Sequence, residues 1–308
     1  MMQNSKYTVL MSVYYKEKPE YLSLSIESML NQTVKPDEFI IVKDGPLTTE
    51  LDEVINNFVT AYPKTFNIIV NETNLGLGPA LAKGIENSKN ELIARMDSDD
   101  YVVSTRCERQ LEKFREDPKL GMVGSYEAEF VDDIDNVISI HRVPSENDEI
   151  ERFMHRRCSV LHPTVMYKKS AVLKSGNYQS VLLYEDYDLF ARMVLEYHIK
   201  SYNIPEPLYY IRTSEDFFKR RGGIKYAKTV LKFKWGQYRK GYMSLMDFCI
   251  SGLGQAFVCV LPNSLRKIFY MKYRDKNNYD RTDKSFTGCS IIKCWRNGKL
   301  YNEFVPNG

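Results

Sequence analysis

The chain has 308 residues, of which 43% are hydrophobic, 13% aromatic and 27% charged, so it is not a disordered protein and is long enough for one large domain with an extension. The formal net charge of +3 hides an asymmetry: residues 200–308 contain 21 Lys and Arg against 8 Asp and Glu, whereas the first 199 residues carry 22 basic and 32 acidic side chains. A basic C-terminal part on an acidic body predicts an anionic partner, such as phospholipid, a phosphorylated substrate or nucleic acid.

Neither the cysteines nor the apolar runs indicate a secreted or membrane-spanning protein. The six cysteines form no Cys-x-x-Cys pair and have no His at zinc spacing, so we interpret them as reduced thiols of an intracellular protein. Residues 1–6 are polar, which argues against a signal peptide, and no run of about 18 purely apolar residues is present. The sequence therefore predicts a cytoplasmic protein.

Runs of strand-forming residues alternate with helical patterns in the first part of the chain. The expected strands are 7–14, 38–43, 66–70, 91–96 and 121–125. The expected helices between them are 19–31, 48–62, 78–88 and 104–117. Such alternation predicts βαβ units with right-handed connections and a parallel sheet.

The alternation ends after residue 125. A hairpin, two helices and a strand are expected next, at 126–143, 148–158, 184–197 and 206–214. The turn of the hairpin is predicted near Asp135 and Asn136, and the last hundred residues are expected to be helical and basic.

Carboxylates follow two of the expected strands. Asp44 ends the second strand, and Asp97, Ser98, Asp99 and Asp100 end the fourth. Ligands of such sheets bind beyond the carboxyl ends of the strands, so these acids would face one crevice. Two carboxylates one residue apart can hold Mg²⁺ or Mn²⁺ and leave coordination positions for phosphate oxygens, and the ion would then neutralise charge on a departing diphosphate.

Local structure offers an alternative for each of these acids. Asp100 or Ser104 could cap the helix expected to begin near residue 104, which explains the acidic run equally well. Asp44, followed by Gly45 and Pro46, also fits a tight turn, which is the more frequent role of such a sequence.

The segment around Asn74, Gly76 and Gly78 could let backbone amide groups approach a phosphate at the start of a helix. The glycine spacing does not match the dinucleotide-binding fingerprint, so this segment alone is a weak indication.

A second acidic group, Glu185, Asp186 and Asp188, lies at the start of an amphipathic helical pattern. These acids either stabilise the helix N-terminus, or one of them is a general base whose pKa is raised by burial and by its acidic neighbours.

Two further sites have both a functional and a structural interpretation. Arg220 and Arg221 precede two glycines and could close over a phosphate, but a solvated basic turn is an equally good reading. His162 is expected in the core rather than on the acceptor side of a site.

Together these segments resemble the family-2 inverting glycosyltransferases with the GT-A fold, over about residues 5–215. The resemblance is carried by the order and spacing of "TVLMSVYYKEKPEYLSLSIESMLNQT", "KPDEFIIVKDGP", "NLGLGPALAKGI", "LIARMDSDD" and "YEDYDLFARM". The details "YKEKPEYL", "DGPLTTEL" and "RRGG" are most similar to bacterial transferases that assemble exopolysaccharide, capsule and O-antigen repeat units, such as those of amylovoran synthesis.

The resemblance implies an α/β fold of the GT-A type, in which a Rossmann-like mixed sheet is flanked by helices. The catalytic domain would span residues 1–215, with a nucleotide-binding half at 1–100 and an acceptor half at 101–215. Residues 216–308 would form a helical, basic region that associates with membrane.

The resemblance also implies a donor site. Ser12, Val13 and Tyr14 would wall the base pocket, and Asp44 would hydrogen-bond the nucleobase, although the family more often shows Asp-Asp-Gly-Ser where this chain reads Lys-Asp-Gly-Pro. A UDP-sugar is the favoured donor. Asn74 and Gly78 match positions that line the nucleotide site. Asp97 would face the ribose and the donor sugar, and Asp99 would bind Mn²⁺ or Mg²⁺.

For catalysis, the resemblance assigns Asp186 as the base, with Glu185 as the alternative. Asp186 would take the proton of an acceptor hydroxyl as that oxygen attacks the anomeric carbon from the face opposite the diphosphate, which inverts the configuration. Arg220 or Arg221 would help to hold the leaving group. The Gln-x-x-Arg-Trp signature of processive enzymes is absent, which favours transfer of one sugar per acceptor.

The C-terminal segment Met243–Arg274 is apolar but interrupted, and it is followed or accompanied by cations: Arg266, Lys267, Lys272 and Arg274. It is either a helical hairpin packed on the catalytic domain or at a dimer contact, or an interfacial helix pair on the anionic inner face of the plasma membrane. The resemblance favours the interfacial pair, because such enzymes use acceptors linked to polyprenyl diphosphate.

Two other classes of function are less well supported. A sugar-nucleotidyltransferase should carry a Gly-rich basic loop after the first strand, where this chain has Lys16 and Lys18 but no glycine. A non-catalytic saccharide- or lipid-binding protein would bind its ligand without turnover, even with Asp99 or Asp186 replaced. Nucleic-acid binding is not expected, because the basic part contains no recognised module, and the oligomeric state is left open.

Overall fold

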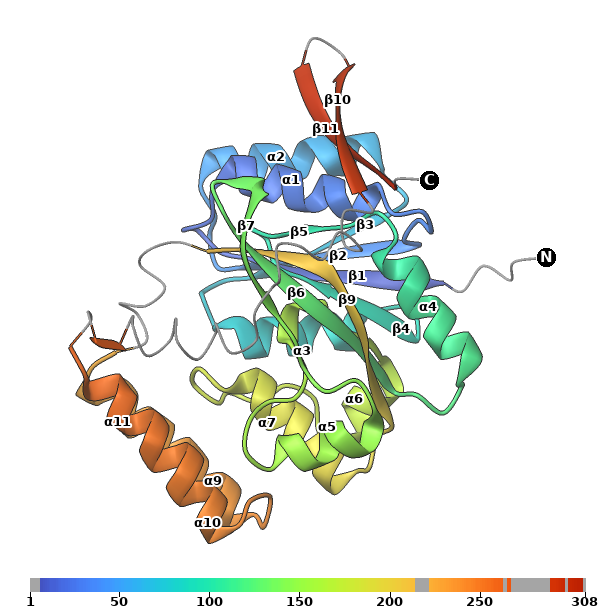
Figure 1. Cartoon of the computed structure of the whole chain (residues 1–308). Helices are drawn as coiled ribbons and strands as arrows, with labels where there is room; N and C mark the ends of the chain where they lie inside the picture. The colour runs from blue at the N-terminus through green and yellow to red at the C-terminus, as the bar shows by residue number, and fades with distance from the viewer. Residues whose placement is uncertain (1–5, 214–221, 263–264, 267–288, 297–298, 307–308) are drawn as a thin grey trace.

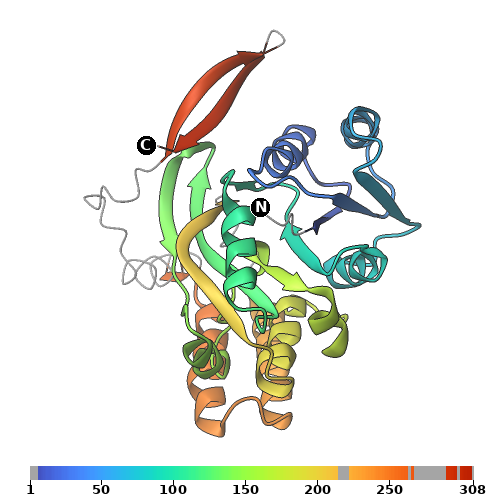
Figure 2. The ribbon, with the colours of Figure 1, turned by 90° about the vertical axis from the view of Figure 1, so that its right-hand side faces the viewer.

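The computed structural model describes residues 6–213, 222–262, 265–266, 289–296 and 299–306. Its centre is a nine-stranded sheet in the order β3-β2-β1-β4-β8-β6-β9-β5, with β7 paired to β6. Helices cover both faces of this sheet (Figures 1 and 2). The mixed α/β architecture expected from the sequence is confirmed.

The first half of the chain forms the parallel part of the sheet. Its strands are β1 (Tyr7–Val13), β2 (Glu38–Asp44), β3 (Phe66–Asn71) and β4 (Leu92–Met96). The connecting helices are α1 (Pro19–Leu30), α2 (Thr49–Ala61) and α3 (Leu77–Asn87). Proline at the start of α1 and the Thr48 cap of α2 show why these helices begin there.

The second half makes the sheet mixed. Its strands are β5 (Tyr101–Val102), β6 (Met122–Val131), β7 (Asp133–His141), β8 (Met166–Lys168) and β9 (Ser201–Arg212). Strand β8 is antiparallel to both β4 and β6, whereas β9 is parallel to β6. The parallel arrangement predicted from strand–helix alternation is therefore present in β1 to β4, and the antiparallel strand β8 makes the whole sheet mixed, as the resemblance implied.

Helices of the second half are short. They are α4 (Arg106–Glu116), α5 (Asn147–Met154), η1 (His162–Thr164), α6 (Lys169–Lys174), α7 (Glu185–Ala191) and the π-helical η2 (Arg192–Glu196). The hairpin of β6 and β7 is present, but its turn is at Asp132, which has a φ of 60° and lies earlier than the predicted turn at Asp135 and Asn136.

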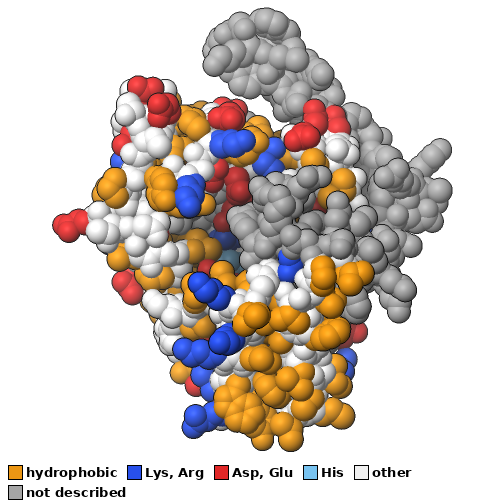
Figure 3. Space-filling model, turned by 90° about the vertical axis from the view of Figure 1, so that its left-hand side faces the viewer, with side chains coloured by type: hydrophobic (Ala, Val, Ile, Leu, Met, Phe, Trp, Pro, Cys, Tyr) orange, Lys and Arg blue, Asp and Glu red, His pale blue; other side chains and the backbone are white. Residues whose placement is uncertain are grey.

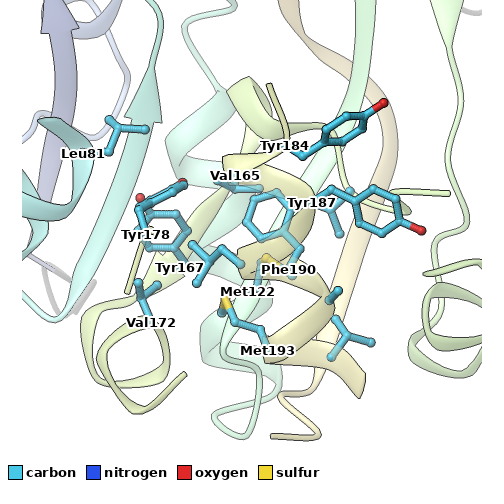
Figure 4. Packing of buried hydrophobic residues seen from close by; sticks show 14 of the residues in the cluster. Leu81, Met122, Val165, Tyr167, Val172, Tyr178, Tyr184, Tyr187, Phe190 and Met193 are labelled. Atoms are coloured by element: carbon cyan, nitrogen blue, oxygen red, sulfur yellow. The ribbon is translucent and has the colours of Figure 1, made fainter. Parts of the chain in front are cut away.

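Two hydrophobic cores lie on opposite faces of the sheet, because successive residues of a strand point to opposite sides. On β1, Val9 and Met11 belong to the core under α1 and α2, whereas Leu10 faces α3. Figure 4 shows the core of the second face, where Tyr167, Tyr178 and other buried aromatic side chains pack beside α7. Buried aromatic side chains thus help to position α7.

The expected C-terminal helices are present as a pair. Helix α9 (Ile224–Arg239) packs against a second helix composed of α10 (Leu245–Asp247), the π-helical η3 (Phe248–Leu253) and α11 (Gly254–Val260). Among the described residues, none of the helices combines the length and hydropathy of a membrane span. Strands β10 (Cys289–Arg296) and β11 (Lys299–Pro306) form an antiparallel hairpin, a correction to the helical structure expected there.

The helical pair packs on the α/β part of the chain. The ring of Phe233 on α9 stacks on Tyr184, with centroids 4.1 Å apart, and Lys234 donates to the Arg156 carbonyl at 2.7 Å. Asp247 of α10 forms an ion pair with Arg156 at 2.5 Å. One face of the pair is therefore fixed against α5 and α7.

Candidate functional site

A cavity of about 1090 Å³ opens at the carboxyl ends of β1, β2 and β4. Because β1 pairs in parallel with both β2 and β4, the residues that end these three strands meet at one edge. The cavity wall includes most of the predicted donor-site residues: Ser12, Tyr14, Asp44, Asn74, Asp97 and Asp99.

Two of the predicted donor-site residues do not line this cavity. Val13 is buried in the core. Gly78 lies within α3, where a β-carbon would come within 2.9 Å of the Gln179 carbonyl oxygen and 3.3 Å of the Glu185 β-carbon. Gly78 therefore lets α3 approach α7, while its neighbours Gly76 and Leu77 reach the cavity.

Asp44 is buried and fixes the loop between β3 and α3. Its carboxylate accepts hydrogen bonds from the backbone N–H groups of Leu75 and Gly76, both at 2.9 Å, and from Asn71 Nδ2 at 3.0 Å. Gly76 has a φ of +91°, a conformation that favours glycine. Asp44 thus orders the loop that follows the neighbouring strand β3, not a turn at its own Gly45 and Pro46, and its contact with a nucleobase stays a prediction.

Asp97 is held in place by a buried arginine. The Arg95 side chain is 2% exposed, and its guanidinium group grips the Asp97 carboxylate through both terminal nitrogens, with Nη1 2.7 Å from Oδ2. The hydroxyl of Tyr209 also donates its hydrogen bond nearby, to Asp100 Oδ2 at 3.0 Å. A bidentate contact of this kind fixes the carboxylate plane.

Asp99 faces the cavity in an acidic environment. Burial, together with the nearby carboxylates of Asp97 and Glu17, raises the pKa of Asp99 to about 7. Ser98 donates a hydrogen bond to Glu17 Oε2 at 2.5 Å, which ties Glu17 to the acidic loop. A bound cation would stabilise the ionised form of the Asp99 carboxyl group in these surroundings.

The capping interpretation of the acidic run is wrong. Helix α4 begins at Arg106, and its N-cap Thr105 makes no side-chain capping bond. Asp100 instead accepts hydrogen bonds from the Arg212 backbone N–H, at 2.8 Å, and from Tyr209. Asp100 therefore joins the acidic loop to the end of β9.

The structure adds cavity residues that the sequence analysis did not select, among them Glu17, Tyr21 and Arg212. The Arg212 guanidinium lies 3.9 Å from the Tyr21 ring centroid, and its Nε donates to the Asp99 carbonyl at 3.1 Å. A lone arginine at the end of an apolar strand was the available sequence signal. In the structure, Arg212 places a fixed positive charge beside the acidic loop, where it could bind an anionic ligand.

The candidate bases Glu185 and Asp186 begin α7, next to the cavity rather than in its wall. Burial raises the pKa of Glu185, and the charge of Asp186 adds to that effect. Asp186 Oδ1 accepts the N–H of Tyr187 at 2.7 Å. The contact between Gly78 and Glu185 brings this helix start against α3, whose first residues line the cavity.

Asp188 and His162 have structural roles. Asp188 is buried and pairs with Arg192 and Lys240, each at 3.0 Å. His162 lies 2.7 Å from the Tyr178 hydroxyl, and burial lowers the pKa of His162 well below its usual value, so it is neutral. The core position predicted for His162 is confirmed, whereas Arg220 and Arg221 lie outside the described residues.

The residues present fit a divalent cation that also takes ligands from a diphosphate. In the described part of the chain, no group of three or more His, Cys, Asp or Glu side chains is arranged to hold a metal by itself. Asp99 can supply one hard oxygen ligand, and phosphate oxygens and water can complete the shell, which is how Mg²⁺ is commonly bound.

Comparisons with known proteins agree with this fold. Residues 8–175 match the model of the glycosyl transferase family 2. The chain is 36% identical to the UDP-Gal:alpha-D-GlcNAc-diphosphoundecaprenol beta-1,3-galactosyltransferase of Escherichia coli, over 87% of this chain and 96% of that protein. It is 34% identical to the amylovoran biosynthesis glycosyltransferase AmsE of Erwinia amylovora, over 72% of this chain and 82% of that protein.

Solved structures show the same fold at low sequence identity. A mannosyltransferase from Pyrobaculum calidifontis in complex with GDP-Man and Mn²⁺ superposes with a TM-score of 0.59 at 12% identity, covering 93% of this chain and 84% of that one. TarS of S. aureus in complex with UDP-GlcNAc gives a TM-score of 0.56 at 14% identity, covering 97% of each chain. With the family model matching more than half of the sequence, the conclusion is direct: this chain belongs to glycosyl transferase family 2.

Proposed function

We propose that this glycosyltransferase moves one sugar from a nucleotide-sugar, with a UDP-sugar as the favoured donor, to a saccharide acceptor carried on a polyprenyl diphosphate. The observation that carries the proposal is the cavity at the ends of β1, β2 and β4, with Asp97, Asp99 and Arg212 in its wall. Its size suits a nucleotide-sugar, since ligand cavities of several hundred to about 1,000 Å³ are usual. The related E. coli galactosyltransferase, which uses a UDP-sugar, supports the donor class.

The proposed reaction inverts the anomeric carbon in a single displacement. Asp186, or Glu185 in its place, removes the proton from the acceptor hydroxyl while that oxygen attacks the sugar. The raised pKa of Glu185 is consistent with a carboxyl group near this position that can hold a proton. Arg95 holds the Asp97 carboxylate in one orientation. In the proposed reaction, this carboxylate contacts the donor sugar and holds its anomeric carbon in position for attack.

Asp99 is proposed to bind Mn²⁺ or Mg²⁺. When bound, the ion would supply positive charge to the diphosphate of the donor, and Arg212 would add a second positive charge from the end of β9. The acidic surroundings of Asp99 and the Mn²⁺ in the structurally similar mannosyltransferase support this assignment.

The pathway we propose is synthesis of a bacterial surface polysaccharide, at the inner face of the plasma membrane. The E. coli relative acts on a diphosphoundecaprenol-linked sugar, and the Erwinia relative takes part in amylovoran biosynthesis. The sequence lacks the Gln-x-x-Arg-Trp signature of processive enzymes, which supports addition of one sugar rather than polymerisation.

A thermal-shift experiment with nucleoside diphosphates tests the donor site. UDP with Mn²⁺ is expected to raise the Tm by roughly 5–10 °C at concentrations far above Kd. UDP alone should raise it less, and Asp99→Asn should remove the increment due to the metal. Asp148→Asn, at an exposed aspartate of α5, is the matched control. A larger shift with another nucleoside diphosphate would replace the UDP assignment, and no shift with any of them would contradict the donor site.

A further inference from the structure

The helix composed of α10, η3 and α11 carries its large apolar side chains on the outside. Their spacing of three or four residues puts them on one face, and each is 50–64% exposed: Met246, Ile250, Leu253, Phe257 and Val260. We call these five residues the docking face. A helix of a water-soluble protein normally buries such a stripe.

The opposite side of the same helix carries small side chains and packs on α9. Gly252, Ala256 and Cys259 are buried there. A β-carbon on Gly252 would lie only 3.3 Å from the β-carbon of Lys234, so the two helices approach closely at this position. The helix is therefore held with its small residues inward, and the exposure of its large residues is a consequence of tight packing on the other side.

The helical pair is strongly cationic. Residues 222–262 contain six Lys and Arg and one acid, Asp247, which is buried against Arg156 and Ser244. Exposed cations of α9 are Lys225, Lys228, Lys232 and Arg239. An apolar stripe accompanied by cations, with no exposed acid in residues 222–262, is typical of helices that lie in the headgroup region of anionic membranes.

A groove of about 1270 Å³ runs between this helix and α5. Arg152, Arg156 and Arg157 contribute to its wall from the α5 side, and Ile250 and Phe257 contribute from the other. Figure 3 shows the hydrophobic side chains gathered over the C-terminal helices, with Lys and Arg along one edge. Glu149 and Asp247 also line the groove, and Asp247 pairs with Arg156, so three cations against two acids leave this border of the apolar surface net positive.

Aromatic residues lie at the end of the helical pair away from the nucleotide cavity. Trp235 is 47% exposed, and its ring centroid is 5.1 Å from that of Tyr238 and 5.4 Å from that of Phe248. Trp and Tyr are enriched at membrane–water interfaces, where their rings have one apolar and one hydrated side.

We propose that the docking face lies on an anionic lipid bilayer, with Arg152 and the exposed lysines of α9 at the headgroups. The purpose of such docking rests on the proposed function, since a polyprenyl-linked acceptor is embedded in a membrane. The surface is close to the candidate bases: Gln255 Nε2, on the groove side of α11, is 3.4 Å from the hydroxyl of Tyr184, the residue before α7. Docking would therefore present the start of α7 to acceptors at the membrane surface.

Charge favours a bilayer over a second copy of the chain as the occupant. Two copies meeting through this surface would bring their cations together, which opposes association. Phosphate headgroups supply the opposite charge. Arg266, which the sequence analysis grouped with the membrane-facing cations, is not one of them, because it is buried and donates to the Cys259 carbonyl. Lys267, Lys272 and Arg274 lie outside the described residues.

Vesicle co-sedimentation of the full chain tests the proposal. The wild type should bind vesicles of phosphatidylcholine with phosphatidylglycerol and should bind phosphatidylcholine alone far more weakly. Ile250→Ser should weaken binding roughly tenfold, because an exposed Ile loses its burial in lipid. Ile138→Ser, at a 49% exposed isoleucine of β7, is the matched control and should bind as the wild type does. Arg152→Gln should weaken binding about fivefold, on the anionic vesicles alone.

The outcomes separate the proposal from its rivals. The proposal would be overturned if Ile250→Ser and a second variant, Phe257→Ser, both bound anionic vesicles as tightly as the wild type does. It would also be overturned if the wild type formed a dimer in vesicle-free solution and Ile250→Ser dissociated that dimer. Transfer to a water-soluble, short-chain sugar diphosphate separates docking from chemistry: Ile250→Ser should retain that reaction and lose transfer to an acceptor in vesicles. Vesicle binding without transfer to either acceptor would contradict the proposed function and leave the docking face supported.

Discussion

The cavity at the ends of β1, β2 and β4 and the docking face depart from the usual arrangement of a folded protein in opposite ways. The cavity buries charge: Asp97, Asp99 and Asp100 lie within four residues, at a place where burial raises the pKa values of Asp99 and Asp100. The docking face exposes large apolar side chains, although the opposite side of the same helix is buried. Folding alone favours neither arrangement, so each is a place to look for a ligand.

The two regions also differ in the contacts that hold their side chains in place. In the acidic loop, Asp97 is tied to Arg95 and Asp100 to Tyr209. The docking face has no such support, because an apolar surface needs only area. Single substitutions should therefore have large effects on chemistry in the cavity, and small effects on stability and chemistry at the docking face.

The largest expected effect is that of Asp99→Asn. Loss of the carboxylate that we assign to the divalent ion should lower kcat/KM by about 10³–10⁴-fold, since charge stabilisation by a metal is worth several kcal/mol. The Tm without ligand should stay equal or rise, because one of three neighbouring carboxylates is removed. The measurement is steady-state transfer with Mn²⁺ beside a thermal melt. Normal activity would show that the ion, or the need for one, lies elsewhere.

A somewhat smaller effect distinguishes the two candidate bases. Asp186→Asn is expected to lower kcat about 10²–10³-fold with little change in donor Kd, because a general base contributes to the chemical step. Glu185→Gln should lower kcat by less than tenfold if Asp186 is the base. Both variants should be assayed over a range of pH, together with donor titration by calorimetry. The reverse order of the two effects would assign the base to Glu185.

Asp44→Asn should act through the loop between β3 and α3. The amide group would put a donor where Leu75 and Gly76 also donate, so that at least one buried N–H loses its acceptor. We expect a loss of about 2 kcal/mol in the free energy of unfolding and a roughly tenfold rise in donor KM, as the cavity wall becomes less ordered. Urea unfolding and donor kinetics measure the two changes. Weaker donor binding with unchanged stability would instead indicate direct contact with the nucleobase.

Much of the fold could be predicted, because the first four strands carry strong local signals. Residues 38–43 and 91–96, for example, are short runs of strand formers that end in acids, and the matching strands β2 and β4 do end at the cavity. Strand β5 has two residues and no periodicity to detect. The antiparallel placement of β8 depends on pairing with β4 and β6, which are distant in sequence and leave no local pattern.

The sequence predicted the acidic residues of the candidate site better than its basic residues. Asp97 and Asp99 are one residue apart in sequence, directly after a strand, so the strand end alone suggests a shared role. Arg212 comes to the same cavity from the end of β9, through its bonds to the acidic loop. Gly78 was assigned to the nucleotide, but its lack of a side chain serves the close approach of α3 to α7. Contacts between distant segments decide such roles.

The smallest expected effect concerns stability at the docking face. Phe257→Ser should change the free energy of unfolding by no more than about 0.5 kcal/mol, because the ring is 61% exposed and loses little burial. Val230→Ser, at a fully buried position of α9, should cost about 2–3 kcal/mol, because it removes buried apolar surface and buries a hydroxyl group. Urea unfolding of both variants in the absence of lipid makes the comparison. A large loss for Phe257→Ser would mean that the exposed ring supports the fold in water, and the contrast between the two regions would then lie in burial alone.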